Sequence, residues 1–200
     1  DYLPRFFASF RKPLLKLSQF YAILIITERS VLIKERINME ELLKSLQELL
    51  AIESVARRDQ EKPFGNGVAQ ALDYTLSLCQ RMGFHTKNAD GLYGYAEIGE
   101  GAEIIGCLGH LDVVPAGDGW HYPPYAGTID TIDDKGPTLI ALFAAHDVAQ
   151  AYERAGKPMP RRIRFIFGQT EESGPWDDMA AYVAHGPAAR AAAKPPPWTP

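Results

Sequence analysis

The chain has 200 residues, enough for one domain with a buried core, and its 46% apolar and 23% charged residues are typical of globular proteins. The formal net charge of −4 gives no electrostatic basis for binding nucleic acid, and basic residues gather only near the N-terminus. Cys79 and Cys107 lie in apolar patterns and form no disulfide framework. We therefore expect reduced thiols in a cytoplasmic protein.

Residues 1–37 differ from the rest of the chain, because basic and aromatic residues precede an apolar run at Phe20–Ile26. That run is shorter than the ~20 apolar residues that span a bilayer, and no small-residue cleavage site of a secretory signal follows it. We interpret residues 1–37 as an extension foreign to the domain, upstream of a true start at Met39, and expect no membrane partner. A helix lying on a membrane surface is the alternative.

From Met39 the apolar spacing predicts regular elements. Leucines recur at helical spacing over residues 39–50, which indicates an amphipathic helix. A second helix is predicted over residues 68–82, and Gly83 supplies its C-terminal stop. Residues 84–87 and 91–98 are predicted to form short strands around a turn.

The next stretch combines a predicted strand with candidate ligands. Ile104–Leu108 is a short apolar run between turn signals, which predicts a buried strand, and His110 and Asp112 follow it. Residues two apart in extended chain share a face, so the imidazole and the carboxylate lie side by side. This pair is typical of a metal-bound histidine whose other ring nitrogen donates to a carboxylate, at the strand end where α/β sheets bind ligands. The alternative is a surface His and Asp in a turn.

The loop at residues 113–125 contains prolines, glycines and aromatic residues. Loops held on a fixed scaffold often carry function, and a plain surface turn is the alternative.

Two adjacent acids, Asp133 and Asp134, precede an apolar segment that predicts a helix from Thr138 to about Arg154, with Pro137 in its first turn. Adjacent carboxylates before a buried helix are costly unless they are paired or bind metal. The alternative is an acidic pair that caps the helix. We expect His146, within this helix, to be packed or solvated and not a ligand.

A strand is predicted over residues 161–168, where apolar residues alternate, and Glu171 and Glu172 follow it. Successive residues diverge in direction, so one glutamate can face a metal while the other faces the cleft as a base. A solvated acidic turn is the alternative. We expect Asp177 and Asp178 on the surface of the following helix.

Three stretches at the ends of predicted elements carry these acids: His110 with Asp112, Asp133 with Asp134, and Glu171 with Glu172. Together they offer carboxylates and one imidazole without thiolates, a donor set that suits zinc, manganese or cobalt in a hydrolytic site. A carboxylate shared by two metals would make a pair that activates water, and a free carboxylate would accept the proton and pass it to the leaving amine. The chain has no Gly-x-Ser-x-Gly motif and no cysteine placed with a histidine as a nucleophile, so metal-activated water is the favoured chemistry.

Three motifs carry a resemblance to a known family: residues 109–115 (GHLDVVP), 133–137 (DDKGP) and 171–174 (EESG), in the family's order. From about Met39 to Tyr182 the chain resembles the di-zinc dipeptidases and deacylases that include PepV, carnosinase, glutamate carboxypeptidase and succinyl-diaminopimelate desuccinylase. It is most similar to the PepV-like dipeptidase branch. The resemblance implies an α/β fold with a mixed, largely parallel sheet flanked by helices.

The resemblance also implies residue roles. His110 would bind one metal, Asp112 would orient it, and Asp133 would bridge two metals, with its neighbour Asp134 across an unusual peptide bond. Glu171 would be the general base, and Glu172 would be a ligand of the second metal. Two Zn²⁺ per complete site are implied, with Mn²⁺ or Co²⁺ as substitutes. The implied substrate is a dipeptide or a short N-acyl amino acid.

The chain departs from the family before Asp133, where Gly127–Asp130 runs directly into Thr131 and a hairpin's worth of residues is missing. A further acidic ligand, a C-terminal histidine and the lid domain of the family are expected beyond this sequence. We therefore interpret residues 38–186 as part of a metallopeptidase catalytic domain and residues 187–200 as an irregular tail. We expect this chain alone to bind metal poorly and to be inactive.

The leading hypothesis is thus a metal-dependent dipeptidase, a hydrolase acting on peptide bonds. Two alternatives stay open: an N-acyl amino acid deacylase or carboxypeptidase of the same family, and a non-catalytic remnant that serves as a binding or structural module.

Overall fold

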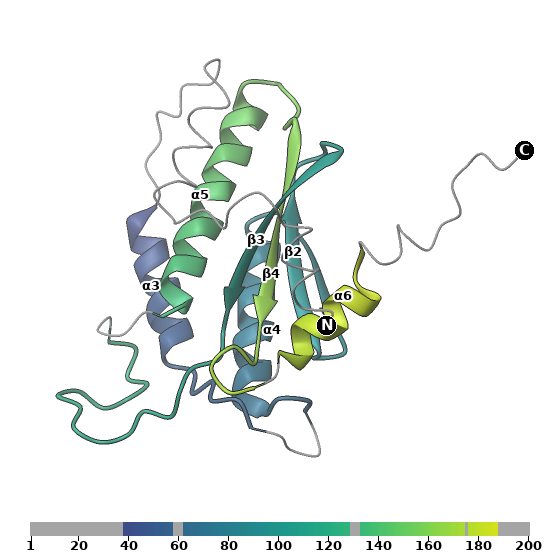
Figure 1. Cartoon of the computed structure of the whole chain (residues 1–200). Coiled ribbons are helices and arrows are strands. Elements are labelled where there is room, and N and C mark those ends of the chain that lie inside the picture. The colour runs from purple at the N-terminus through teal and green to yellow at the C-terminus, as the bar shows by residue number, and fades with distance from the viewer. Residues whose placement is uncertain (1–37, 58–61, 129–132, 175, 188–200) are drawn as a thin grey trace, which may run out of the picture.

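The computed structural model describes residues 38–57, 62–128, 133–174 and 176–187, so the predicted extension at residues 1–37 and most of the predicted tail lie outside the described residues. Figure 1 shows a central sheet with helices on both faces. The described elements, in chain order, are α3 (Met39–Leu50), α4 (Asn66–Arg81), β1 (His85–Ala89), β2 (Tyr93–Ile98), β3 (Glu103–His110), α5 (Lys135–Arg154), β4 (Arg161–Gly168) and α6 (Asp177–His185).

The described strands form one sheet in the order β1-β2-β4-β3. β1 pairs with β2 and β2 with β4 in antiparallel fashion, whereas β3 and β4 are parallel. Because α5 makes the crossover between these parallel neighbours, the carboxyl ends of β3 and β4 lie side by side. The mixed α/β class implied by the resemblance is confirmed.

Strand β4 lies in the centre of the sheet and is buried on both faces. Ile163, Phe165 and Phe167 belong to the main core with residues of α3, α4 and α5, while Ile166 packs against α6. Arg164 of the same strand is also buried, and its guanidinium donates from Nε to Glu97 Oε1 at 2.7 Å. The strand bounds at 161–168 are confirmed, and the helices packed on the two faces of the sheet account for the burial.

The predicted burial of Ile104–Leu108 was wrong. Ile104 is 42% exposed, and Ile105, Cys107 and Leu108 are only half-buried. The reason is that β3 is the edge strand of the described sheet, so one side of its backbone has no strand beside it in this part of the chain. An apolar run predicts a strand but does not predict its place in the sheet.

The helix predictions agree with the structure to within a few residues. Asn38 Oδ1 accepts the Glu41 backbone N–H at 3.2 Å, which caps α3. Gly83 follows α4 with a φ of +81°, the left-handed conformation that glycine adopts readily at helix ends. Helix α5 begins at Lys135, three residues before the predicted start, and Pro137 stands in its first turn.

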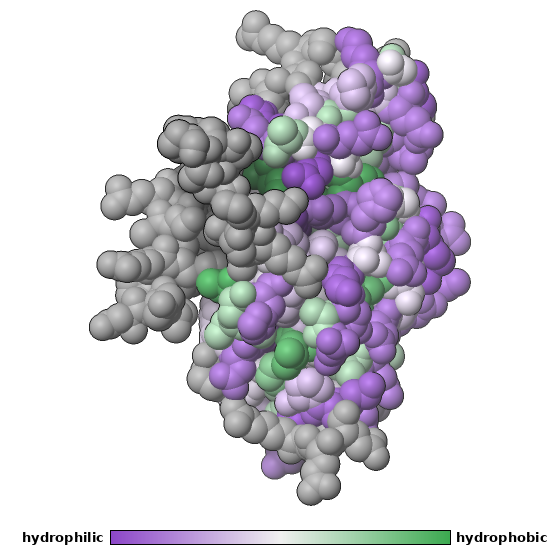
Figure 2. All heavy atoms as spheres, turned by 90° about the vertical axis from the view of Figure 1, so that its right-hand side faces the viewer, coloured by the Kyte–Doolittle hydropathy of each residue, from purple (hydrophilic) through white to green (hydrophobic). Residues whose placement is uncertain are grey.

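The surface and the thiols fit the composition. On the face in Figure 2, hydrophilic side chains dominate and apolar ones lie between them in small groups. None of the helices in the described ranges is long and apolar enough to cross a bilayer. Burial raises the pKa of both free thiols, Cys79 and Cys107, to about 12. The cytoplasmic location stays a prediction.

The sheet order makes a testable prediction with two matched substitutions. Ile163→Ala in β4 should lower the free energy of unfolding by about 2–5 kcal/mol, because it opens a cavity in a fully packed core. Ile104→Ala in β3 should cost less than about 1 kcal/mol, because that residue is 42% exposed and its removal opens no closed cavity. Urea unfolding followed by circular dichroism measures both, and equal losses would contradict the placement of β3 at an edge.

Candidate metal centre

The parallel pairing of β3 and β4 builds the site. Their register places His110 opposite Gly168, so the segments that follow both strands leave the sheet at the same edge. One segment carries His110 and Asp112, and the other carries Glu171 and Glu172. Two sequence motifs that lie about sixty positions apart thus meet at the carboxyl ends of neighbouring strands, where open α/β sheets bind ligands.

A buried carboxylate joins the two segments. Asp112 has no exposed surface, and its Oδ1 and Oδ2 accept the backbone N–H groups of Glu171 at 3.2 Å and Glu172 at 3.0 Å. Oδ1 also lies 3.4 Å from Nδ1 of His110. A carboxylate removed from water is stabilised only by such donors, so Asp112 fixes both the histidine and the glutamate loop.

The backbone around Asp112 is anchored to the rest of the domain. Leu111 N donates to Gly168 O at 2.8 Å, which extends the pairing of β3 and β4 past the end of the strand. On the other side, the buried Ser54 hydroxyl donates to Leu111 O at 2.6 Å, and Val113 N donates to Ser54 O at 3.1 Å. The strand extension that carries Asp112 is therefore held on both sides.

One ring nitrogen of His110 is hydrogen-bonded to Asp112, and the other faces Glu171 and Asp133. Its Nδ1 lies 3.0 Å from the Asp112 carbonyl oxygen, which can only accept, so Nδ1 carries the proton. Nε2 lies 3.9 Å from Glu171 Oε2 and 4.0 Å from Asp133 Oδ1. Burial lowers the pKa of His110, but hydrogen bonding to Asp112 and the charges of Asp112 and Asp134 outweigh it and raise the pKa to about 9.

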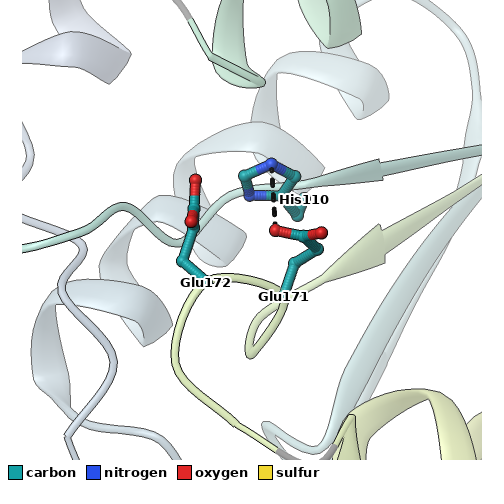
Figure 3. Close-up of side chains that lie close together, drawn as sticks. All are labelled: His110, Glu171 and Glu172. Carbon is teal, nitrogen blue, oxygen red and sulfur yellow. Dashed lines mark ion pairs between the residues drawn. The ribbon is translucent and has the colours of Figure 1, made fainter.

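Three potential ligand atoms converge in front of the imidazole. One atom each from His110, Glu171 and Glu172 lies within 4.8 Å of the others. Figure 3 shows Glu171 directed at the histidine ring, with Glu172 beside it on the same loop. The structure thus brings His110, Asp112, Glu171 and Glu172 together as the sequence analysis expected, and it places Asp133 at the edge of the group with an 84% exposed side chain.

The two aspartates before α5, Asp133 and Asp134, make different contacts. A cis peptide bond joins Asp133 and Asp134, where the resemblance implied an unusual bond. Asp134 Oδ2 accepts the His110 backbone N–H at 3.2 Å and the Thr138 hydroxyl at 3.2 Å, so this residue supports the histidine's backbone. Burial raises the pKa of Asp134. The predicted loss of a hairpin before Asp133 falls at residues 129–132, which lie outside the described residues.

Sequence reasoning missed the role of Lys135. Its side chain is 1% exposed, and Nζ donates to the backbone oxygens of Leu49 at 3.1 Å and Ile52 at 2.9 Å. These carbonyls end α3, so the lysine fastens the start of α5 to the end of α3 beside the acidic pair. Burial lowers the pKa of Lys135 to about 8. The sequence shows only that this lysine stands between two aspartates and a predicted helix, and that position does not predict burial of its side chain.

The predicted surface position of Asp178 was wrong. Asp178 is 1% exposed and accepts hydrogen bonds from the Gln169 backbone N–H, the Thr170 hydroxyl at 2.8 Å and the Met179 backbone N–H at 2.8 Å. It accepts a backbone N–H within the first turn of α6 and holds the chain just after β4, before the glutamate loop. Its neighbour Asp177 is exposed, as predicted.

Comparison with known proteins finds a family match over part of the chain. Residues 106–196 match the description "Peptidase family M20/M25/M40". The M20 match contains the HxD, DDK and EE motifs and reaches beyond residue 186, where composition had placed a domain boundary. The resemblance predicted from the three motifs is confirmed.

Relatives of the chain include "Putative dipeptidase YtjP" of Bacillus subtilis (strain 168), 41% identical over 157 residues that cover 73% of this chain and 33% of the relative. A Staphylococcus aureus (strain USA300) protein named in the same way is 37% identical over 153 residues, 70% of this chain and 32% of the relative. The chain spans about a third of the length of these curated relatives.

Solved structures share the fold. The crystal structure of human carnosine dipeptidase 1 aligns with a TM-score of 0.56 at 23% identity, over 84% of this chain and 38% of that chain. The dipeptidase Dug1p of Saccharomyces cerevisiae aligns with the same TM-score of 0.56 at 19% identity and the same coverage of 84% and 38%.

The contacts of Asp112 predict the titration of His110. In the metal-free protein, Asp112→Asn should lower the pKa of His110 from about 9 toward its ordinary value of 6.5, because the carboxylate charge and its hydrogen bond are lost while burial, the hydrogen bond to the backbone carbonyl of residue 112 and the charge of Asp134 remain. NMR titration of the labelled ring measures this pKa. The exposed Asp118→Asn is the control and should leave it unchanged, and a value near 9 in Asp112→Asn would contradict the assignment.

Lys135 predicts a pH-dependent stability. Its pKa falls from 10.5 to about 8 on folding, so between these values the unfolded chain holds more protons and the free energy of unfolding rises with pH. The rise attributable to this lysine is roughly 2 kcal/mol between about pH 8 and 10. Urea unfolding of the wild type and Lys135→Met at both pH values isolates it, and an identical pH dependence in the two proteins would refute it.

Proposed function

We propose that this chain carries part of the catalytic domain of a metal-dependent dipeptidase, with its site at the carboxyl ends of β3 and β4. The observation that supports this most is the state of His110, whose Nδ1 proton is held by Asp112 while Nε2 faces Glu171 and Glu172. A histidine fixed in this way is prepared to bind a metal through Nε2. The M20 match over residues 106–196 and the relatives named as dipeptidases support the same activity.

The residues present fit a divalent ion of intermediate hardness. The donor set of one imidazole and several carboxylates, without a thiolate, suits Zn²⁺, and it would also accept Mn²⁺ or Co²⁺. We propose that His110 and Glu172 are ligands and that Asp133 is the shared ligand of two ions. The 84% exposed Asp133 side chain leaves its carboxylate accessible for that role.

The remaining residues would transfer the proton and orient the metal ligands. A bound ion would supply Lewis-acid chemistry, by polarising the scissile carbonyl and activating water. Glu171 would accept the proton of the attacking water at its carboxylate and pass it to the leaving amine. Asp112 would keep the His110 ring oriented and hold the Glu171 backbone, and Asp134 would hold the backbone of His110.

Two ions need more ligands than the described residues offer. The described cluster supplies one atom each from His110, Glu171 and Glu172, with Asp133 nearby, whereas each zinc takes about four ligands and Glu171 is assigned to proton transfer. We therefore propose that the 200-residue chain binds metal weakly and turns over no dipeptide on its own.

The proposal is tested by transplanting residues 38–186 into the matching segment of the Bacillus subtilis relative, which supplies the rest of a full-length protein. The chimera should hold about two metals and hydrolyse dipeptides. In it, Glu171→Gln should lower kcat about 100- to 10,000-fold with unchanged metal content, because only proton transfer is lost. His110→Ala should lose metal and activity together, whereas His146→Ala, a histidine of α5 outside the cluster, should retain both.

The outcomes separate the hypotheses. A metal-free, inactive chimera beside a metal-loaded parent would contradict the proposal and favour a binding or structural module. Faster hydrolysis of N-acyl amino acids than of dipeptides would favour a deacylase of the same family. Robust dipeptide hydrolysis by the isolated chain would refute its proposed inactivity.

A further inference from the structure

A buried carboxylate of α6 lies beside the metal cluster and takes no part in the chemistry proposed above. Asp178 stands in the first turn of this nine-residue helix and is 1% exposed. Removing an ionised carboxylate from water is strongly unfavourable unless hydrogen-bond donors surround it. Capping a helix does not require such burial, because a side-chain oxygen at the surface can accept the same N–H groups. The donors around Asp178 show what the burial serves.

Two of these three donors belong to the chain between β4 and the glutamates. Oδ2 of Asp178 accepts the Gln169 backbone N–H, and Oδ1 accepts the Thr170 hydroxyl at 2.8 Å. The third donor, the Met179 backbone N–H at 2.8 Å, lies in α6 itself. Asp178 therefore directs most of its hydrogen bonds to the two residues that immediately precede Glu171.

Four consecutive residues are thus held by two buried carboxylates. Asp178 of α6 contacts residues 169–170, and Asp112, on the segment after β3, accepts the backbone N–H groups of Glu171 and Glu172. The two acids reach the loop from different elements, and in Figure 1 the helix lies beside the loop that follows β4. Each half of the loop therefore has its own anchor, and the glutamates depend on both.

Asp178 also lies close to the imidazole. A Cβ added to Gly168 would lie 3.6 Å from Oδ2 of Asp178 and 3.3 Å from the Cβ of His110, so little space separates the two side chains. Nε2 of His110 lies 3.9 Å from Oε2 of Glu171. A shift of the loop away from Asp178 changes this distance, and with it the geometry that the cluster offers to a metal ion.

Helix α6 is itself fastened to the sheet, so its first turn is a fixed support. The Tyr182 ring packs edge-on against Tyr93 of β2, with 5.3 Å between the ring centroids. The Tyr182 hydroxyl accepts a hydrogen bond from Nη1 of Arg164 in β4 at 3.1 Å. Arg164 in turn donates to Glu97 of β2. The carboxylate of Asp178 is therefore carried by an element that both central strands hold.

We infer that Asp178 is a positioning residue, which holds residues 169–170 so that Glu171 and Glu172 meet the metal site in working geometry. The inference rests on the proposed dipeptidase function and adds a residue of α6 to it. Groups that orient metal ligands without touching the metal typically change metal affinity or activity about 10- to 100-fold when they are replaced.

Two variants weaken the contact and two act as controls. Asp178→Asn turns one acceptor into a donor, so at least one of its three donors loses its partner, and Thr170→Val removes the hydroxyl contact alone. Asp177→Asn makes the same change of charge at the exposed neighbour in the same turn. Val183→Gly weakens α6 at a 40% exposed residue and leaves Asp178 in place.

Hydrogen exchange of the ¹⁵N-labelled 200-residue chain, followed by NMR, tests the inference without turnover. Asp178→Asn should speed exchange of the Glu171 and Glu172 amides at least about tenfold, and Thr170→Val should do so about threefold. Both controls should leave these two amides unchanged, although Val183→Gly should speed exchange within α6. Unchanged glutamate amides in Asp178→Asn and Thr170→Val, or equal acceleration by Val183→Gly, would overturn the inference.

The chimera links the loop to metal and turnover. There Asp178→Asn should weaken Zn²⁺ binding about 10- to 100-fold in chelator competition. At saturating Zn²⁺ it should lower kcat by a similar factor with KM within about twofold, whereas Asp177→Asn should change neither constant.

The inference and the proposed function fail separately. An Asp178→Asn chimera with the parent's zinc affinity and kcat would overturn the positioning role and leave the dipeptidase in place. Faster exchange at Glu171 and Glu172 beside a chimera that holds no metal would support the hold of Asp178 on the loop and overturn the dipeptidase.

Discussion

The buried carboxylate of Asp112 is the constraint on which the site depends. An ionised group without exposed surface costs several kcal/mol unless donors surround it, and here the donors are the backbone N–H groups of Glu171 and Glu172 and the ring of His110. The same carboxylate therefore sets the path of the glutamate loop and lies beside Nδ1 of His110, whose proton is directed at the Asp112 carbonyl oxygen. Removing it would leave the backbone N–H groups of Glu171 and Glu172 without these acceptors.

The fold supplies the other half of the geometry. A parallel pair of neighbouring strands brings two chain segments to one edge of the sheet, and the crossover helix α5 returns the chain with its acidic start next to that edge. Lys135 and Ser54 then fasten the surrounding backbone to the end of α3 and the residues after it. The ligands thus sit on segments held by strands, helices and buried hydrogen bonds, which is the rigidity that a catalytic site requires.

Much of the site was predictable from the sequence, because its chemistry lies in short motifs. His110 with Asp112 and Glu171 with Glu172 each follow an apolar run, and the periodicity placed both runs in strands. The burial of Lys135 and Asp178 was not predictable. Lys135 depends on backbone oxygens that are distant in sequence, and Asp178 depends on a turn that the spacing does not specify. The exposure of β3 was missed for a related reason: strand order is a long-range property, and an edge strand and a central strand can share one apolar pattern.

The most direct test of the account is the position of zinc in crystals of this chain soaked in excess Zn²⁺, located by anomalous diffraction. The account predicts a zinc ion about 2.0–2.2 Å from Nε2 of His110 and from a carboxylate oxygen of Glu172, with Nδ1 still facing Asp112. Zinc bound through Nδ1, or found only at a histidine outside this cluster, would contradict the claim that Asp112 prepares His110 as a metal ligand.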